Sequence, residues 1–176
     1  MKNEIHLTTP LQPETIEKLK IGDKVFISGI IYTARDAAHK RLVQLIQSGR
    51  ELPFDLAGQI IYFVGPAPAK PGEVIGSAGP TTSYRMDPYS PVLLDNGLKG
   101  MIGKGPRSKE VIASILRNKA IYFAAVGGAA VVMADCVKSV EIIAYPELGP
   151  EAVRKLQVEN MPVFVATDTM GNDIYS

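Results

Sequence analysis

The residues best suited to chemistry lie in the segment Gly76–Ser90, which reads GSAGPTTSYRMDPYS. Glycine and proline interrupt this segment, and serine and threonine favour caps and turns over helix interiors, so the pattern predicts a loop. Such a loop can present backbone N–H groups and hydroxyls to an anion, with Arg85 to neutralise the anion's charge. Taken alone, however, the segment is better explained as a loop that only caps the following helix.

Two more cations fall where predicted strands end. Arg35 follows the strand predicted for Lys24–Thr33, and Lys104 ends the short strand predicted for Lys99–Lys104. Ligands of an open α/β sheet bind beyond the carboxyl ends of its strands. If both cations meet the Gly76–Ser90 segment there, the site is cationic, rich in glycine and lined with hydroxyls, although spacing alone does not show that they meet. Arginine pairs with a carboxylate in a bidentate fork and lysine adds a point charge, so this group suits a small dicarboxylate.

The elements that must position these residues alternate between strand and helix. Lys24–Thr33 alternates β-branched and other residues and predicts a strand, with a bulge or a close backbone approach at Gly29. Asp36 is a good N-cap for a helix that ends at Gly49, which places Arg35 at the strand-to-helix junction. The alternation along the chain indicates an α/β fold with some parallel strand pairing.

The remaining elements follow from the same patterns. Ser108 suits the N-cap of a helix that continues to about Arg117, and another helix is predicted at Pro150–Val158. Gly127-Gly128 marks a sharp turn, and Ala129–Cys136 fits either a helix or a strand. The other predicted elements are a weak edge strand, a short helix, a helical turn and four further strands: Lys2–Thr8, Glu14–Leu19, Tyr89–Leu94, Gln59–Val64, Ala120–Val126, Val137–Tyr145 and Pro162–Ala166.

The composition excludes several classes of protein. The 176 residues are 46% hydrophobic and 21% charged, which is typical of one folded domain and not of a disordered chain. The formal net charge of +1 gives no reason to expect nucleic acid or an anionic membrane as a partner. No apolar stretch approaches the roughly 18 residues of a membrane-spanning helix, and the first residues lack the apolar region of a secretory signal. The common nucleotide-binding glycine motifs are also missing from the sequence.

The cysteine content predicts a cytoplasmic protein that holds no metal itself. Cys136 is the single cysteine, so the chain can form no internal disulfide. One thiol cannot hold a zinc or iron–sulfur site, which takes several thiolate or imidazole ligands. Cys136 lies in the apolar run Ala129–Val137, so we expect a buried, inert thiol. A reducing cytoplasm fits these features.

Three segments together resemble one protein family. TARDAAHKR (Thr33–Arg41), GPTTSYRMDPY (Gly79–Tyr89) and KGPRS (Lys104–Ser108) are similar to the β subunit, or C-terminal domain, of the iron–sulfur class I fumarases and L-tartrate dehydratases. The resemblance runs from about Ile5 to the last strand, and GPTT-x-x-RMD together with an upstream ARD-x-AH is highly specific. It implies a single swivelling β/β/α domain over residues 1–176, with mixed parallel and antiparallel strands layered against helices.

The resemblance also implies roles for individual residues. Arg35 and Arg85 match arginines that hold substrate carboxylates, and Lys104 matches a lysine that contacts the substrate. Thr81 matches a threonine proposed to act in proton transfer at carbon. The family has Gly-Asn or a similar pair where this chain has Gly105-Pro106, and we do not expect this difference to displace Lys104.

Three neighbours of these residues belong to the same motifs. The resemblance makes Asp36 and His39 candidates for orienting Arg35, and Thr82 a candidate support beside the reacting threonine. From the residues alone, His39 instead fits a surface histidine capped by its own helix. Arg35 likewise fits a solvated loop cation, so this alternative remains open for both.

A partner and a cofactor are implied as well. The family's α subunit carries a [4Fe–4S] cluster whose non-cysteine-ligated iron binds the substrate hydroxyl and a carboxylate, and the active site lies between the two subunits. We therefore expect an α2β2 heterotetramer that hydrates fumarate reversibly to L-malate, and an isolated β chain that is inactive. An L-tartrate dehydratase β subunit is the first alternative. A dicarboxylate-binding or regulatory domain without chemistry, and a structural domain whose glycine-rich loop only caps a helix, are the others.

Overall fold

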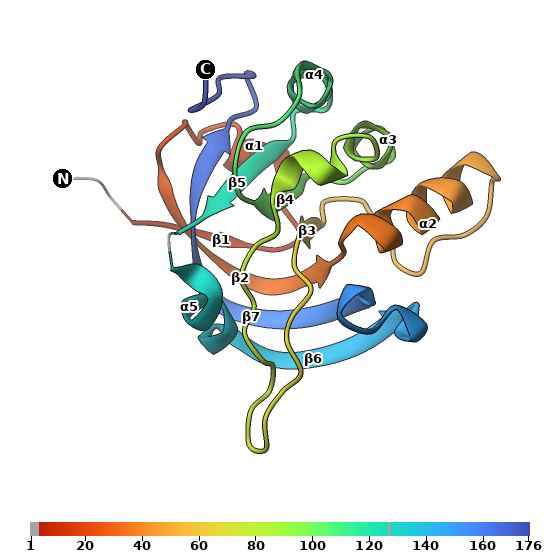
Figure 1. Ribbon diagram of the computed structural model, residues 1–176. Helices are drawn as coiled ribbons and strands as arrows, with labels where there is room; N and C mark the ends of the chain where they lie inside the picture. Colours follow the sequence, from red (N-terminus) through yellow and green to blue (C-terminus); the bar gives the residue numbers. More distant parts are fainter. Residues whose placement is uncertain (1–3, 127) are drawn as a thin grey trace.

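Seven strands form one sheet in the computed structural model, which describes residues 4–126 and 128–176 (Figure 1). The order across the sheet is β1-β2-β3-β4-β5-β7-β6, and β2 also pairs with β7. The strands β2, β3, β4, β5 and β7 therefore form a closed path. The strands are β1 (Ile5–Thr8), β2 (Lys24–Thr33), β3 (Ile60–Tyr62), β4 (Gly100–Gly103), β5 (Ile121–Ala125), β6 (Val137–Ala144) and β7 (Val153–Thr167).

The first five strands run parallel to their neighbours, and β7 runs antiparallel to β2, β5 and β6. This mixed pairing confirms the predicted α/β fold with parallel and antiparallel strands. Because β2, β3, β4 and β5 are parallel, their carboxyl ends share one edge of the sheet. The helices are α1 (Pro13–Ile16), α2 (Asp36–Gln47), α3 (Ser90–Asp95), α4 (Lys109–Asn118) and α5 (Ala129–Asp135), with 3₁₀ turns η1 (Ser83–Met86) and η2 (Pro146–Glu151).

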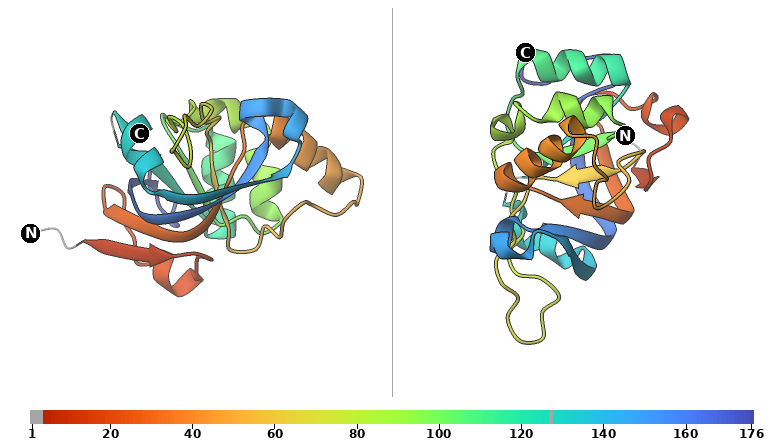
Figure 2. Two further views of the ribbon diagram at one scale, coloured as in Figure 1. Left: turned by 90° about the horizontal axis from the view of Figure 1, so that it is seen from below. Right: turned by 90° about the vertical axis from the view of Figure 1, so that its right-hand side faces the viewer.

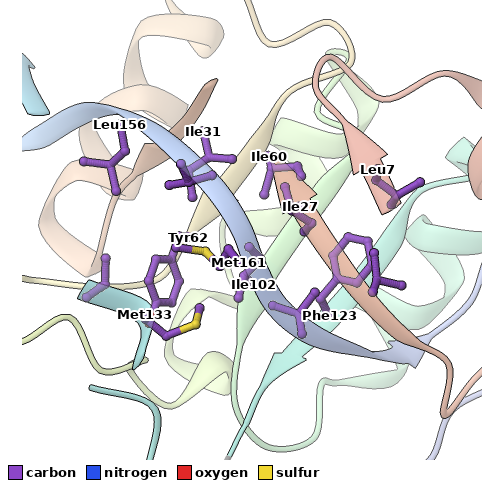
Figure 3. Close-up of a cluster of buried hydrophobic side chains, with 14 of the residues drawn as sticks. Leu7, Ile27, Ile31, Ile60, Tyr62, Ile102, Phe123, Met133, Leu156 and Met161 are labelled. Atoms are coloured by element: carbon purple, nitrogen blue, oxygen red, sulfur yellow. The ribbon is translucent and has the colours of Figure 1, made fainter. Parts of the chain in front are cut away.

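Alternate residues of the central strands face two separate hydrophobic clusters. On β3, Ile60 and Tyr62 join the cluster drawn in Figure 3, whereas Ile61 joins the cluster beneath α2, α3 and α4. The first cluster is closed by α1 and α5 on the other face of the sheet. Figure 2 shows the same layers from two further directions, with the connector of residues 66–78 projecting beyond them. The central strands β3 and β4 are therefore buried on both faces, which leaves the ends of these strands to carry a site.

The bulge expected at Gly29 is confirmed. The register of β2 against β7 shifts between Ile27 and Gly29, and the φ angle of Gly29 is +115°. A Cβ atom at this position would lie 2.3 Å from the hydroxyl oxygen of Thr9. Only glycine combines this positive φ with so close a neighbour.

The helix predicted at Pro150–Val158 is wrong. Its start belongs to η2, and the rest is the first part of β7, which also contains the strand predicted at Pro162–Ala166. Leu156 pairs with Ile31 on β2 and with Val140 on β6. Arginine, lysine, leucine and glutamine favour a helix by themselves, but a partner strand on each side overrides that preference.

The N-cap predicted at Asp36 is also wrong. Arg35 occupies the N-cap position without a side-chain bond, and Asp36 is the first helical residue. The backbone N–H of Ala37 donates instead to the Glu151 carboxylate at 3.3 Å. A carboxylate from a distant segment therefore serves the helix terminus, which leaves the Asp36 carboxylate available for other contacts.

The structure decides two predictions for the segment Ala129–Cys136, which follows β5. Ala129–Asp135 is the helix α5, and Cys136 after it is half-buried, so the expected buried thiol is wrong. Lys2 of the predicted edge strand and Gly127 of the predicted turn fall outside the described residues. Within the described ranges, no helix is both long enough and apolar enough to cross a membrane.

Candidate active site

Three of the predicted segments meet at the edge where β2 to β5 end. Arg35 lies two residues beyond β2, and Lys104 directly follows β4. The backbone N–H of Thr81 donates to the carbonyl of Phe63, just beyond β3, at 2.7 Å. Thr82 forms an isolated parallel bridge with Lys104. The structure therefore brings the Gly76–Ser90 loop against the ends of β3 and β4.

The Asp36 carboxylate lies between the two predicted carboxylate-binding arginines. Its Oδ2 accepts a hydrogen bond from Arg85 Nε at 2.9 Å, and its Oδ1 lies 3.8 Å from Arg35 Nε. The Arg85 side chain is 47% exposed and that of Arg35 is 25% exposed. One carboxylate against two guanidinium groups leaves a net positive charge. It holds the two cations together at the edge while their exposed parts remain open to a ligand.

The Arg35 side chain runs against the backbone of Gly65. A Cβ atom on Gly65 would lie 3.0 Å from Arg35 Cδ and 3.3 Å from Arg35 Nη1. Because Gly65 has no side chain, the Arg35 guanidinium can lie along the segment that follows β3. Arg35 is therefore a packed residue, and the alternative of a fully solvated loop cation is wrong.

His39 is buried, so its alternative as a surface histidine is also wrong. Its Nδ1 lies 2.9 Å from the carbonyl oxygen of Arg35, and its ring meets Phe63 edge-on at 5.3 Å between centroids. Burial lowers the pKa of His39 to about 4, against the opposing effect of the Arg35 carbonyl. A neutral imidazole can donate only from Nδ1 to this carbonyl, so His39 fixes the backbone of Arg35.

Lys104 opens onto a cavity of about 410 Å³ beside the start of α5. Lys104 is exposed, and Thr81 and Thr82 are half-buried. The lining residues are Gly79, Pro80, Lys104, Ala125, Val126, Gly128, Ala129, Ala130 and Val131. Apart from Lys104 the lining carries no ionisable side chain, so the ammonium is the group that would hold an anion there.

The sequence analysis missed a buried ion pair between Asp87, directly after η1, and Arg107, shortly before α4. Arg107 Nε lies 2.7 Å from Asp87 Oδ1, and the Arg107 side chain is 1% exposed. The guanidinium lies 5.2 Å from the centroid of the Phe63 ring and 4.8 Å from that of Tyr122. The other Asp87 oxygen accepts the backbone N–H of Ser108 at 2.7 Å. Asp87 lies in the RMD segment and Arg107 in the PRS segment. Neither charge had an assigned role, and this was the signal in the sequence that could have indicated the pair.

The described ranges offer no evident metal site. No group of three or more histidine, cysteine, aspartate and glutamate side chains gathers among residues 4–126 and 128–176. The Cys136 sulfur lies 3.7 Å from the Asn160 carbonyl oxygen, and burial raises the pKa of this thiol. A raised pKa disfavours the thiolate that binds metals.

Comparison with known proteins gives one family match over residues 1–176, to the model described as Fumarase C-terminus. A putative L(+)-tartrate dehydratase subunit beta from Methanocaldococcus jannaschii is 41% identical over 171 residues, which is 94% of this chain and 88% of that protein. Fumarate hydratase 2 from Leishmania major is 36% identical over 186 residues, or 98% of this chain and 33% of that protein. The anaerobic class I fumarate hydratase of Escherichia coli is 38% identical, covering 91% of this chain and 30% of that protein. The chain thus spans about a third of these fumarate hydratases but most of the tartrate dehydratase subunit.

Proposed function

This chain belongs to the fumarase C-terminus family, and from that premise we propose that it is the β subunit of a two-subunit hydro-lyase, fumarate hydratase of class I. The reaction is the reversible addition of water to fumarate to give L-malate. The observation that carries the proposal is the gathering of Arg35, Arg85 and Lys104 at one edge of the sheet, beside Thr81. Three cations in one region match the two carboxylates of the substrate.

The cations act by binding and by stabilising charge. Arg35 and Arg85 each present a guanidinium fork to a carboxylate, and Lys104 adds a point charge from the neighbouring strand end. Removal of a proton from the carbon next to a carboxylate moves negative charge onto that carboxylate. Fixed cations already aimed at it stabilise this charge most strongly in the transition state.

Thr81 serves in the transfer of that proton. Its backbone is fixed to the carbonyl of Phe63, so the residue stands at the same edge as the cations. A threonine hydroxyl is a poor base at neutral pH. The role therefore requires that the nearby cations lower its pKa, or that Thr81 passes the proton to another group.

The cofactor of the proposed enzyme is a [4Fe–4S] cluster held by an α subunit. The side chains of the described ranges offer no ligand set for it, which is compatible with a cluster on the partner. When bound, the cluster supplies a Lewis acid for the hydroxyl group that leaves the substrate. This chain contributes the carboxylate-binding and proton-transfer side of the site, in an assembly of two α and two β subunits.

Anaerobic co-purification with a cluster-bearing α subunit tests the proposal. Fumarate, L-malate, L-tartrate and D-tartrate are then assayed separately. Interconversion of fumarate and L-malate by the complex, and none by this chain alone, is the expected result. Tight binding of a dicarboxylate without turnover by any such complex would instead identify a regulatory domain.

An L-tartrate dehydratase β subunit is the second candidate. It is favoured by the relative from Methanocaldococcus jannaschii, of which this chain covers 88% and which is named as a subunit beta. The same three cations suit tartrate, because it is also a dicarboxylate. Turnover of L-tartrate without turnover of L-malate would decide for this candidate.

A further inference from the structure

A ring of hydrogen bonds encloses the peptide that joins Lys104 to Gly105. The backbone N–H of Lys104 donates to Ser83 Oγ at 2.9 Å. Ser83 Oγ and the Tyr122 hydroxyl lie 2.6 Å apart, and the Tyr122 hydroxyl lies 2.8 Å from the carbonyl oxygen of Gly105. Two side chains from different elements, η1 and β5, thus hold the two ends of one dipeptide.

Proton counting fixes the direction of the ring. The Gly105 carbonyl can only accept, so the single phenolic proton of Tyr122 goes to it. Ser83 Oγ already accepts from the Lys104 N–H, and its own proton then goes to the Tyr122 oxygen. Each donor in the ring has one acceptor, and a chain of bonds aligned in this way is mutually strengthening.

The surroundings keep both hydroxyls in place. Ser83 and Tyr122 are fully buried, and Arg107 lies 4.8 Å from the centroid of the Tyr122 ring. A Cβ atom on Gly103 would lie 1.9 Å from Ser83 Oγ, so a glycine at the end of β4 is what admits the serine. The carbonyl of Lys104 also accepts the backbone N–H of Ser83 at 2.9 Å.

We propose that Ser83 and Tyr122 are positioning residues, which hold the backbone of Lys104 so that its ammonium meets the substrate carboxylate. This rests on the proposed function in one respect, namely that Lys104 binds substrate. The ring leaves the lysine side chain free and fixes only its origin, at the mouth of the cavity described above. Neither residue touches the reacting atoms in this scheme. Their effect is to reduce the ordering that binding must impose on Lys104.

Tyr122→Phe is the sharpest test, because it removes the hydroxyl and keeps the ring beside Arg107. In the full chain, we expect amide hydrogen exchange at Lys104 to accelerate about tenfold, the effect of losing one net hydrogen bond. The amide of Met101, inside β4, reports general opening and should change less. Tyr62→Phe is the matched control, since Tyr62 is equally buried and its hydroxyl bonds the Ala78 carbonyl. Exchange at Lys104 should keep the wild-type rate in this control.

The assembled complex supplies the second measurement. Tyr122→Phe should raise the KM for fumarate about tenfold with a smaller change in kcat, as expected for a group that binds substrate and transition state alike. Ser83→Ala should act through the same ring, so the double variant should lose little more than either single one.

Several results would overturn the proposal. Equal acceleration at Lys104 and Met101 would mean that the ring only stabilises the fold, and unchanged exchange would mean that it holds nothing. Faster exchange at Lys104 with an unchanged KM would remove the link to substrate. A wild-type complex without hydratase activity would instead refute the proposed function, and the exchange data would still decide whether the ring positions Lys104.

Discussion

Protonation of His39 should make the protein lose stability in mild acid. Burial lowers the pKa of His39 to about 4 in the folded protein, against 6.5 for an ordinary histidine. Between about pH 4 and pH 6.5, His39 is protonated in the unfolded chain but neutral in the folded protein. The stability that the folded protein gains from a neutral His39 is therefore fully present above about pH 6.5 and is lost as the pH falls toward 4. This loss lowers the free energy of unfolding by about 2.5 kcal/mol between pH 7 and pH 4.5.

His39→Asn isolates this contribution. The asparagine amide can still donate near the Nδ1 position, but it does not titrate. Urea unfolding of both proteins from pH 7.5 to pH 4.5 gives the free energies, and carboxylate effects common to both cancel in their difference. The wild type should lose about 2.5 kcal/mol more than the variant over this range.

A matched control uses the chain's other histidine, His6, which is exposed on β1. Unfolding of His6→Gln under the same conditions measures the effect of replacing a histidine that is exposed. If the stability difference between wild type and His39→Asn stayed constant with pH, the conclusion that His39 is buried and neutral would be refuted. The assignment of Nδ1–H as donor to the Arg35 carbonyl would fall with it.

Three further predictions concern the ion pair and the proposed site. Asp87→Asn leaves Arg107 buried without its counter-charge and should lower the free energy of unfolding by about 3–5 kcal/mol in urea; Asp95→Asn, at an exposed pair, should cost less than about 1 kcal/mol, and equal costs would contradict the buried pair. Arg35→Lys keeps the charge but loses the fork, so KM in the assembled complex should rise at least about tenfold, whereas a KM like that of wild type would exclude a bidentate contact. Thr81→Ala should abolish most turnover while dicarboxylate binding, measured by calorimetry, persists; near-normal turnover with intact binding would remove Thr81 from proton transfer.

Local patterns predicted those elements that local interactions decide. The strand Lys24–Thr33 and its bulge at Gly29 were correct because side-chain alternation and a positive φ are properties of short stretches. The region Pro150–Val158 was wrong because its strand exists only through two partners distant in sequence. The burial of His39 was missed for the same reason, since Phe63, just beyond β3, covers its ring.

The candidate site was predictable as far as topology dictates it. Parallel strands end at one edge, so the rule for ligand sites placed Arg35 and Lys104 near the glycine-rich loop. The rule does not say which side chains bond to one another. The bonds of Asp36 to Arg85 and of Asp87 to Arg107 join residues from segments distant in sequence, and only the folded chain sets their distances.

The closed path of strands has a consequence for how the molecule is made. β2 (Lys24–Thr33) is synthesised well before its antiparallel partner β7 (Val153–Thr167). The bond from the Arg154 N–H to the Thr33 hydroxyl, for example, spans 121 residues of sequence. Until β7 emerges, one side of β2 has no partner, so the nascent chain carries an open strand edge during the interval between the synthesis of the two strands. Folding of this domain is therefore dominated by contacts distant in sequence, which predicts a slow reaction and a need for protection from aggregation until β7 has been made.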